Sequence, residues 1–164
     1  MEAGENCVLK VLSQSARTST ADVAKMCGMN EGQAESAIAG LENRGIIRGY
    51  RAVVDWERSG LDLVYALIEV SLSLSREMGY DAVARDIVGF PEVEACYLLS
   101  GEHDLTLLVR GQNMQQVAFF VAEKISTMPA VTHTSTHFIL RAYKAGGIVF
   151  MGQGDGDQRL PVCP

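Results

Sequence analysis

The amino-acid sequence predicts an α+β protein made of a helical N-terminal domain and a larger domain with two strand–helix–strand units. The helical part is indicated by apolar residues that recur three and four positions apart over the first third of the chain. The second part is indicated by strand-like alternation after residue 63 and by a weak internal repeat. In that repeat each helical run leads into a similar connector, Gly89–Val93 and then Thr127–Val131.

Three helices are predicted at the start of the chain, over residues 5–15, 21–27 and 30–43. Ser19 and Asp22 stand at capping-box spacing before the second helix, and Gly28 suits the left-handed residue that ends it. Asn30 and Gln33 repeat the capping pattern before the third helix. Two short helices joined by a tight glycine turn are typical of a helix-turn-helix unit, so the third helix is the predicted DNA reader.

The segment Leu41–Asp55 is the most informative stretch for function. Its helical pattern stops at Gly45, a short basic run follows, and the apolar pair Val53-Val54 then predicts a short strand. A helix that ends at glycine and passes into a strand is how a winged or extended helix-turn-helix unit is completed, which indicates nucleic-acid binding. The predicted phosphate contacts are the basic residues in and near this segment: Arg17, Lys25, Arg44, Arg48 and Arg51.

The charge of the chain limits how it can hold DNA. The formal net charge is −6, so DNA contacts must come from a local basic patch. The predicted reading helix carries Glu31 and Glu35 on its outward face and no Lys or Arg before Arg44, although Gln33 and Ser36 can still read base edges. We therefore expect weak DNA binding by each head, with avidity raised about 10²–10⁴-fold in an oligomer. The alternative is a structural helix that has lost DNA reading.

The second domain is predicted to be ferredoxin-like. Strands are expected over residues 64–74, 93–100, 105–111 and 131–143, and helices over 80–88 and 114–127. This βαββαβ order places both helices on one face of a four-stranded antiparallel sheet. Tyr65, Leu67, Tyr97 and Leu99 would then lie on the uncovered face. An exposed, partly apolar sheet face predicts dimerisation.

The predicted domain boundaries follow from these elements. They are a helix-turn-helix DNA-binding domain over 1–51, a linker or hinge strand over 52–62, a ferredoxin-like ligand-binding and oligomerisation domain over 63–144, and a tail over 145–164. The tail is rich in glycine and aspartate. Within it, Ile148–Phe150 is expected to form an extra edge strand and Gly152–Asp157 a mobile loop.

The chain carries few signals of redox, metal or membrane chemistry. Its cysteines form no CxxC pair and are interpreted as reduced thiols of a cytoplasmic protein: Cys7, Cys27, Cys96 and Cys163. The N-terminus has no signal-peptide pattern, and no apolar run is long enough to span a bilayer. His133 and His137 would lie about 13 Å apart on a strand, so one metal ion cannot bridge them. Neither a metal nor a cofactor is predicted.

Several motifs occur in the order and spacing of one family. They are Leu41-Glu42-x-x-Gly45-Ile46-Ile47-x-Gly49-Tyr50, Val54-Asp55, Phe90-Pro91-Glu92-Val93 and Ser100-Gly101-x-x-Asp104. From about Glu5 to Tyr143 the chain resembles the leucine-responsive/AsnC (Lrp/AsnC, feast-or-famine) family of bacterial and archaeal transcription regulators. The resemblance implies double-stranded DNA as a partner, an amino acid or related small metabolite as effector, and homodimers that assemble further into octamers.

An effector site is predicted at the turn Ser100–Asp104. Gly101 would let backbone amides approach a ligand carboxylate, and Asp104 could accept a hydrogen bond from an α-ammonium group. Thr134 and Thr136 on the last strand could add hydroxyl groups. The alternative is a plain hairpin turn, because glycine and aspartate are common turn residues.

Two other functions remain open at this point. One is a ligand-sensing oligomer with weak or lost DNA binding. The other is an enzyme, since sirohaem decarboxylases resemble the same two-domain architecture. The sequence disfavours an enzyme because it shows no nucleophile–base pair, phosphate loop or metal cluster. In addition, Arg48-Gly49-Tyr50 replaces the basic pair typical of those decarboxylases and looks like the regulators.

Overall fold

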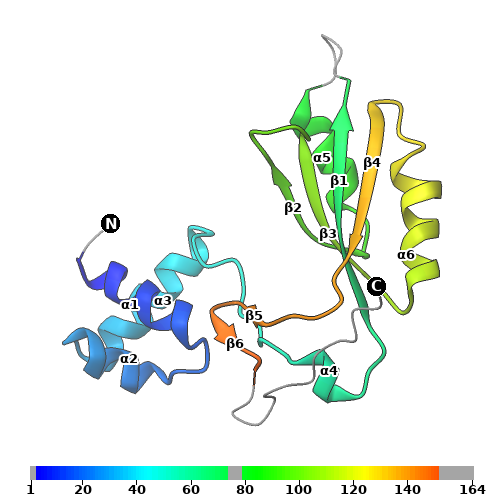
Figure 1. The fold of residues 1–164 in the computed structure, drawn as a ribbon. Coiled ribbons are helices and arrows are strands. Elements are labelled where there is room, and N and C mark those ends of the chain that lie inside the picture. Colours follow the sequence, from blue (N-terminus) through cyan, green and yellow to red (C-terminus); the bar gives the residue numbers. More distant parts are fainter. Residues whose placement is uncertain (1–2, 74–78, 152–164) are drawn as a thin grey trace. The chain divides into compact units, whose positions relative to one another are not determined.

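The computed structural model describes residues 3–73 and 79–151 and divides the chain into two compact units (Figure 1). The helical unit comprises Met1–Val54 together with Lys144–Pro164, and the sheet unit comprises Asp55–Tyr143. Because the described residues after Tyr143 group with the first 54, the sheet unit is connected to the helical unit at both of its ends.

The helical unit is built from α1 (Ala3–Gln14), α2 (Thr20–Cys27) and α3 (Glu31–Asn43). Both predicted caps are confirmed: Ser19 Oγ accepts a hydrogen bond from the Asp22 amide, and Asn30 and Gln33 form a reciprocal capping box. Gly28 ends α2 at φ 66°, the left-handed conformation that glycine adopts at low cost. The apolar faces of the three helices meet in one core: Val8, Val11, Val23, Ala24, Ala34 and Leu41.

The interpretation of all four cysteines as reduced thiols is wrong for one pair. Cys7 in α1 and Cys27 at the end of α2 form a disulfide with their Cα atoms 5.7 Å apart. The two helices pack against each other, which brings together residues 20 positions apart, and no CxxC spacing announces such a contact. Cys96 is a free, half-buried thiol whose pKa is raised by burial, and Cys163 lies outside the described residues.

The segments around the two connections differ from prediction. Val53-Val54 forms no strand, and the predicted linker contains a short helix, α4 (Trp56–Ser59), because Asp55 caps it by accepting a bond from the Arg58 amide. In the tail, Ile148-Val149 does not join the main sheet. It forms β6 and pairs with β5 (Lys144–Ala145) in a separate hairpin. The predicted mobile loop Gly152–Asp157 lies outside the described residues.

The sheet unit has the predicted ferredoxin-like order: β1 (Val64–Leu72), α5 (Tyr80–Val88), β2 (Val93–Leu98), β3 (Leu105–Gly111), α6 (Met114–Phe120) continued by the π-helix η1 (Val121–Ile125), and β4 (Val131–Phe138). The strands are ordered β2-β3-β1-β4 and all pairs are antiparallel. The predicted length of the last strand, to residue 143, is wrong. Its partner β1 begins at Val64, so residues beyond Ile139 have no strand beside them.

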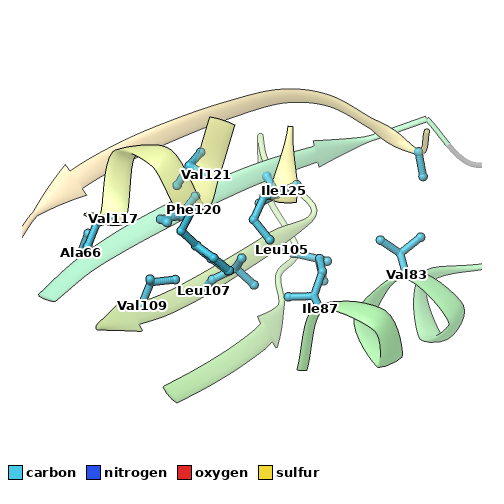
Figure 2. Packing of buried hydrophobic residues seen from close by; sticks show 13 residues of the cluster. Ala66, Val83, Ile87, Leu105, Leu107, Val109, Val117, Phe120, Val121 and Ile125 are labelled. Atoms are coloured by element: carbon cyan, nitrogen blue, oxygen red, sulfur yellow. The ribbon is translucent and has the colours of Figure 1, made fainter. Parts of the chain in front are cut away.

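One face of this sheet is covered by helices and the other is open. Inward residues of β1 and β3 pack against α5, α6 and η1, as the labelled side chains in Figure 2 show. On the opposite face, Leu67, Tyr97 and Leu99 are exposed large hydrophobic residues, as the alternation predicts, and Tyr65 is partly exposed. The sheet therefore presents a partly apolar surface that residues 3–73 and 79–151 leave exposed.

Candidate functional site

The predicted reading helix α3 presents a polar and acidic outer face. Glu31, Glu35 and Ser36 are all exposed. Gln33 is also exposed, but its side-chain oxygen accepts the Asn30 amide at 3.0 Å, so the carbonyl end of this side chain is occupied by the cap. Gln33 and Ser36 nevertheless lie together along an open groove of about 780 Å³ that also passes Gly28. The two predicted base-reading residues thus share one surface.

The five predicted basic contacts are not equally available. Arg44 Nη2 lies 2.6 Å from Glu5 Oε1, and its Nε donates to the Gly40 carbonyl at 3.1 Å. Lys25 lies 3.7 Å from Asp22 in an exposed pair. Arg44 therefore joins α3 to α1, and it keeps less of its hydrogen-bonding capacity for phosphate than a solvated arginine.

Arg17, Arg48 and Arg51 are exposed in the structure. The Arg48 guanidinium lies over Gly45, where a Cβ would stand 3.4 Å from its Cζ. Because Arg48 is exposed, its guanidinium is open to solvent and can donate to a phosphate. The assignment of these three exposed arginines to phosphate contacts stays a prediction.

Two contacts of the helical unit were not anticipated from the sequence. Glu5 is the partner of Arg44 across 39 positions, and Tyr50 donates its hydroxyl to Glu42 Oε1 at 2.8 Å. Partial burial, followed by the hydrogen bond to Glu42, raises the pKa of Tyr50. Both contacts fasten the segment after α3 to the helices, and neither has a local sequence signal.

In the sheet unit, the predicted effector turn is held by Asp104. Its Oδ2 accepts the Leu72 amide at 2.7 Å and its Oδ1 accepts the Tyr80 hydroxyl at 2.9 Å. These bonds, the Leu72 amide first, lower the pKa of Asp104 because they favour the carboxylate. The hydrogen bond that the Tyr80 hydroxyl donates to Asp104 also raises the pKa of Tyr80. Both carboxylate oxygens are thus engaged inside the chain, where they link β1, the turn and the start of α5.

The rest of the predicted effector set does not form one pocket in the described part of the chain. Ser100 and Gly101 are exposed, and a Cβ at Gly101 would meet nothing within 4 Å. Thr134 and Thr136 pair with Val70 and Ile68, whose side chains are buried, so both threonines face the helix-covered side of the sheet. Thr134 Oγ1 is 3.2 Å from Ser126 Oγ and lines a separate groove of about 230 Å³.

A polar cluster on the open face of the sheet was missed by the sequence analysis. Glu69 Oε2 lies 3.2 Å from Nε2 of both His103 and His137. His103 Nδ1 is also 3.1 Å from Ser71 Oγ. Alternation places Glu69 on this face. The register of β1 with β4 brings His137 to the same face, and the turn before β3 brings His103 to it.

The described residues contain no candidate metal site and no candidate membrane span. Over 3–73 and 79–151 no group of three or more acidic, histidine or cysteine side chains could hold a metal ion. No helix in these ranges is both long and apolar enough to cross a bilayer.

Comparison with known proteins identifies the family to which the chain is related. Residues 65–149, more than half of the chain, match the model of the Lrp/AsnC ligand binding domain. The HTH-type transcriptional regulator YugG of Bacillus subtilis is 40% identical over 161 residues, which cover 98% of this chain and 96% of that protein. A proline dehydrogenase transcriptional activator of Rhizobium radiobacter is 31% identical, with coverage of 86% and 90%.

Solved structures share the fold. The leucine response regulatory protein LrpA of Mycobacterium tuberculosis superposes with a TM-score of 0.74 at 23% identity, covering 89% of this chain and 97% of that one. A Neisseria meningitidis transcriptional regulator in complex with L-Met superposes with a TM-score of 0.68 at 23% identity, covering 88% and 93%. The family model and the relatives that align along almost the whole chain lead to one conclusion: this chain belongs to the Lrp/AsnC family of HTH-type transcription regulators.

Proposed function

We propose that this regulator binds double-stranded DNA through its helical unit and that a free amino acid or related small metabolite, bound by its sheet unit, controls that binding. The observation that carries the proposal is the combination of a capped helix-turn-helix with a sheet unit that matches a ligand-binding domain. A relative named as a proline dehydrogenase activator and a structural neighbour bound to L-Met support an amino acid as the effector class. We infer a regulatory role without catalysis, in the cytoplasm.

The proposed DNA surface consists of the outer face of α3 and the basic segment after it. Gln33 and Ser36 supply base contacts, and Arg17, Arg48 and Arg51 supply phosphate contacts. Lys25 adds a contact at the edge of this surface. Arg44 contributes by fixing α3 against α1 through Glu5. Because Glu31 and Glu35 repel phosphate, each head binds weakly and oligomerisation supplies the affinity.

The proposed effector contact is the exposed backbone at Ser100–Gly101. Asp104 acts there as a positioning residue, since the Leu72 amide and the Tyr80 hydroxyl occupy its carboxylate oxygens. The space around Gly101 allows a ligand carboxylate to approach the backbone closely. Thr134 and Thr136 face the other side of the sheet, so a ligand at this turn would not contact them in the same chain.

We further propose that two copies pair through the open sheet face and that the dimers assemble into a higher oligomer such as an octamer. Exposed Leu67, Tyr97 and Leu99 supply the apolar surface for pairing. Association would remove this surface from water, which is the main favourable term in most protein–protein contacts.

A thermal-shift screen of the twenty amino acids tests the effector class. A ligand that binds the folded state raises the melting temperature in proportion to RT ln(1 + [L]/Kd), so at least one amino acid should give a concentration-dependent shift. Gly101→Val should abolish the shift while leaving the unliganded melting temperature nearly unchanged, because its side chain would enter open space. Gly79→Ala, at another open glycine of the sheet unit, should keep the shift.

The outcomes of this screen separate the proposals. If none of the twenty amino acids raises the melting temperature, the proposal that the effector is an amino acid is contradicted. If an amino acid raises the melting temperature but the protein binds no DNA, the protein is a ligand-sensing oligomer. The acidic face of α3 would favour that function.

A further inference from the structure

The Cys7–Cys27 pair joins the first helix of the helical unit to the helix-turn-helix turn. Cys7 lies in the middle of α1, and Cys27 is the last residue of α2, directly before the left-handed Gly28. Their Cα separation of 5.7 Å lies within the range that a disulfide spans without backbone movement. Both thiols can therefore pair or separate while the three helices keep their places.

The turn that follows Cys27 carries the geometry of the motif. The Met29 amide donates to the Ala24 carbonyl, and Met29 packs against the apolar core of the helical unit. A Cβ added to Gly4 would stand 3.2 Å from Met29 Cε, so the start of α1 lies directly against this turn. A covalent bond between Cys7 and Cys27 restrains α1 and the turn as one body.

The two cysteines differ in whether they border a groove. Cys27 lines the open groove of about 780 Å³ that also contains Gly28, Gln33 and Ser36, whereas Cys7 does not line it. Both cysteines are half-buried. A small reagent in the groove lies beside Cys27 and not beside Cys7, so we assign Cys27 as the attacking thiol and Cys7 as the resolving thiol.

We propose that Cys7 and Cys27 form a reversible redox modification site that sets the rigidity of the helix-turn-helix. The oxidant class is a low-molecular-weight disulfide. The Cys27 thiolate attacks one sulfur of that molecule, a mixed disulfide forms, and one small thiol leaves. The Cys7 thiolate then attacks Cys27 Sγ and releases the second small thiol. Two protein thiols and one small disulfide thus become one protein disulfide and two small thiols, and an excess of the small thiol reverses the exchange.

Oxidation has two physical consequences. It closes a loop between residues 20 positions apart, which lowers the entropy of the unfolded helical unit and raises its melting temperature by about 10 °C or more. It also restrains the groove that contains Gln33 and Ser36, the residues assigned to base contacts. The effect on DNA rests on the proposed function, and we expect the oxidised form to bind operator DNA at least threefold more tightly than the reduced form.

The test uses the full chain with Cys96→Ser and Cys163→Ser, so that only the pair can react. The protein is equilibrated in buffers with different ratios of oxidised to reduced glutathione, alkylated, and weighed by mass spectrometry. Calorimetry follows the unfolding of the two units, and fluorescence anisotropy follows DNA binding. We expect reversible conversion between a disulfide form and a form with two alkyl groups, with a shift of the helical-unit transition and none of the sheet-unit transition.

Two single-cysteine variants serve as controls, and separate results would overturn the redox site and the proposed DNA binding. Neither Cys27→Ser nor Cys7→Ser can form the disulfide, so both should lack the stabilisation of the oxidised protein. Cys7→Ser should stop at one glutathione adduct on Cys27, because no resolving thiol remains. A pair that stays oxidised in excess reduced glutathione, or stays reduced in excess oxidised glutathione, overturns the switch. So does reversible conversion with unchanged melting. Absence of DNA binding in both redox states would instead refute the proposed function, while thiol trapping and calorimetry would still decide the switch.

Discussion

Arg48→Ala provides a quantitative test of the proposed DNA surface. Arg48 is exposed on the segment after α3, and no ion pair of its side chain is seen among the described residues. Its removal should therefore cost little folding free energy and should chiefly delete one phosphate contact in each head. Arg44→Ala is a poorer probe, since it also breaks the bond to Glu5 and the link between α3 and α1.

The magnitude follows from counterion release. The slope of log K against log salt is negative. The loss of one phosphate contact makes it less steep by about 0.9, or by about 1.8 for the two heads of a dimer. Between 50 and 200 mM salt, the wild-type protein should consequently lose about 12-fold more affinity than the variant. The assay is fluorescence anisotropy on one duplex at four salt concentrations.

A matched control keeps the change of charge and alters its position. Arg85→Ala removes an exposed arginine from α5 in the sheet unit. Its slope should equal that of the wild type, because Arg85 is not part of the proposed DNA surface, which lies in the helical unit. Equal slopes for Arg48→Ala and Arg85→Ala would refute the assignment of Arg48 to a phosphate contact.

Three further predictions concern the framework of the site. The Leu72 amide and Tyr80 hydroxyl hold the pKa of Asp104 below its unfolded value of about 3.9, so the stability that they add is present above that value and is lost as pH falls through the lower folded pKa. Circular dichroism between pH 2 and 6 should show this loss, and Asp104→Asn should flatten it; an unchanged profile would contradict the argument. Leu41→Ala should destabilise the helical unit by about 2–5 kcal/mol in urea titration, since Leu41 is fully buried, and a change below about 1 kcal/mol would argue against this core. Ser19→Ala should cost about 0.5–2 kcal/mol in the same assay by removing the cap of α2, and no measurable cost would show that the cap is dispensable.

Local signals in the sequence predicted the framework well. The caps at Ser19 and Asn30 were predictable because donor and acceptor stand three residues apart, where a helix start determines their contact. The order β1-α5-β2-β3-α6-β4 was predictable because alternation and helical spacing each persist over a whole element. The repeat then restricted the topology to the ferredoxin-like arrangement.

Contacts between distant segments were not predictable in this way. Glu5 meets Arg44, Tyr80 meets Asp104, and Cys7 meets Cys27 only because elements pack in three dimensions. None of these pairs stands at a sequence spacing that a single helix or turn would bring into contact. As a result the sequence suggested Arg44 as a phosphate contact and Asp104 as an effector contact. The structure shows both side chains engaged in hydrogen bonds within the chain.

Two local errors have simple causes. The polar stretch after Asp55 was interpreted as a linker, yet one aspartate cap suffices to start the four-residue α4. Ile148-Val149 is a strand, as its apolarity indicated, but it does not lie at an edge of the four-stranded sheet. The turn Gly146-Gly147, with both φ values positive, instead folds it back onto Lys144-Ala145.

We propose that this chain is a sequence-specific DNA-binding regulator controlled by an amino acid. The most direct measurement is anisotropy of a labelled duplex from the region upstream of the protein's own gene, compared with a scrambled duplex at 150 mM salt. We predict at least tenfold tighter binding to the upstream duplex and a change of at least threefold when the amino acid found by thermal shift is added. Equal affinity for the two duplexes, with no response to that amino acid, would contradict the account.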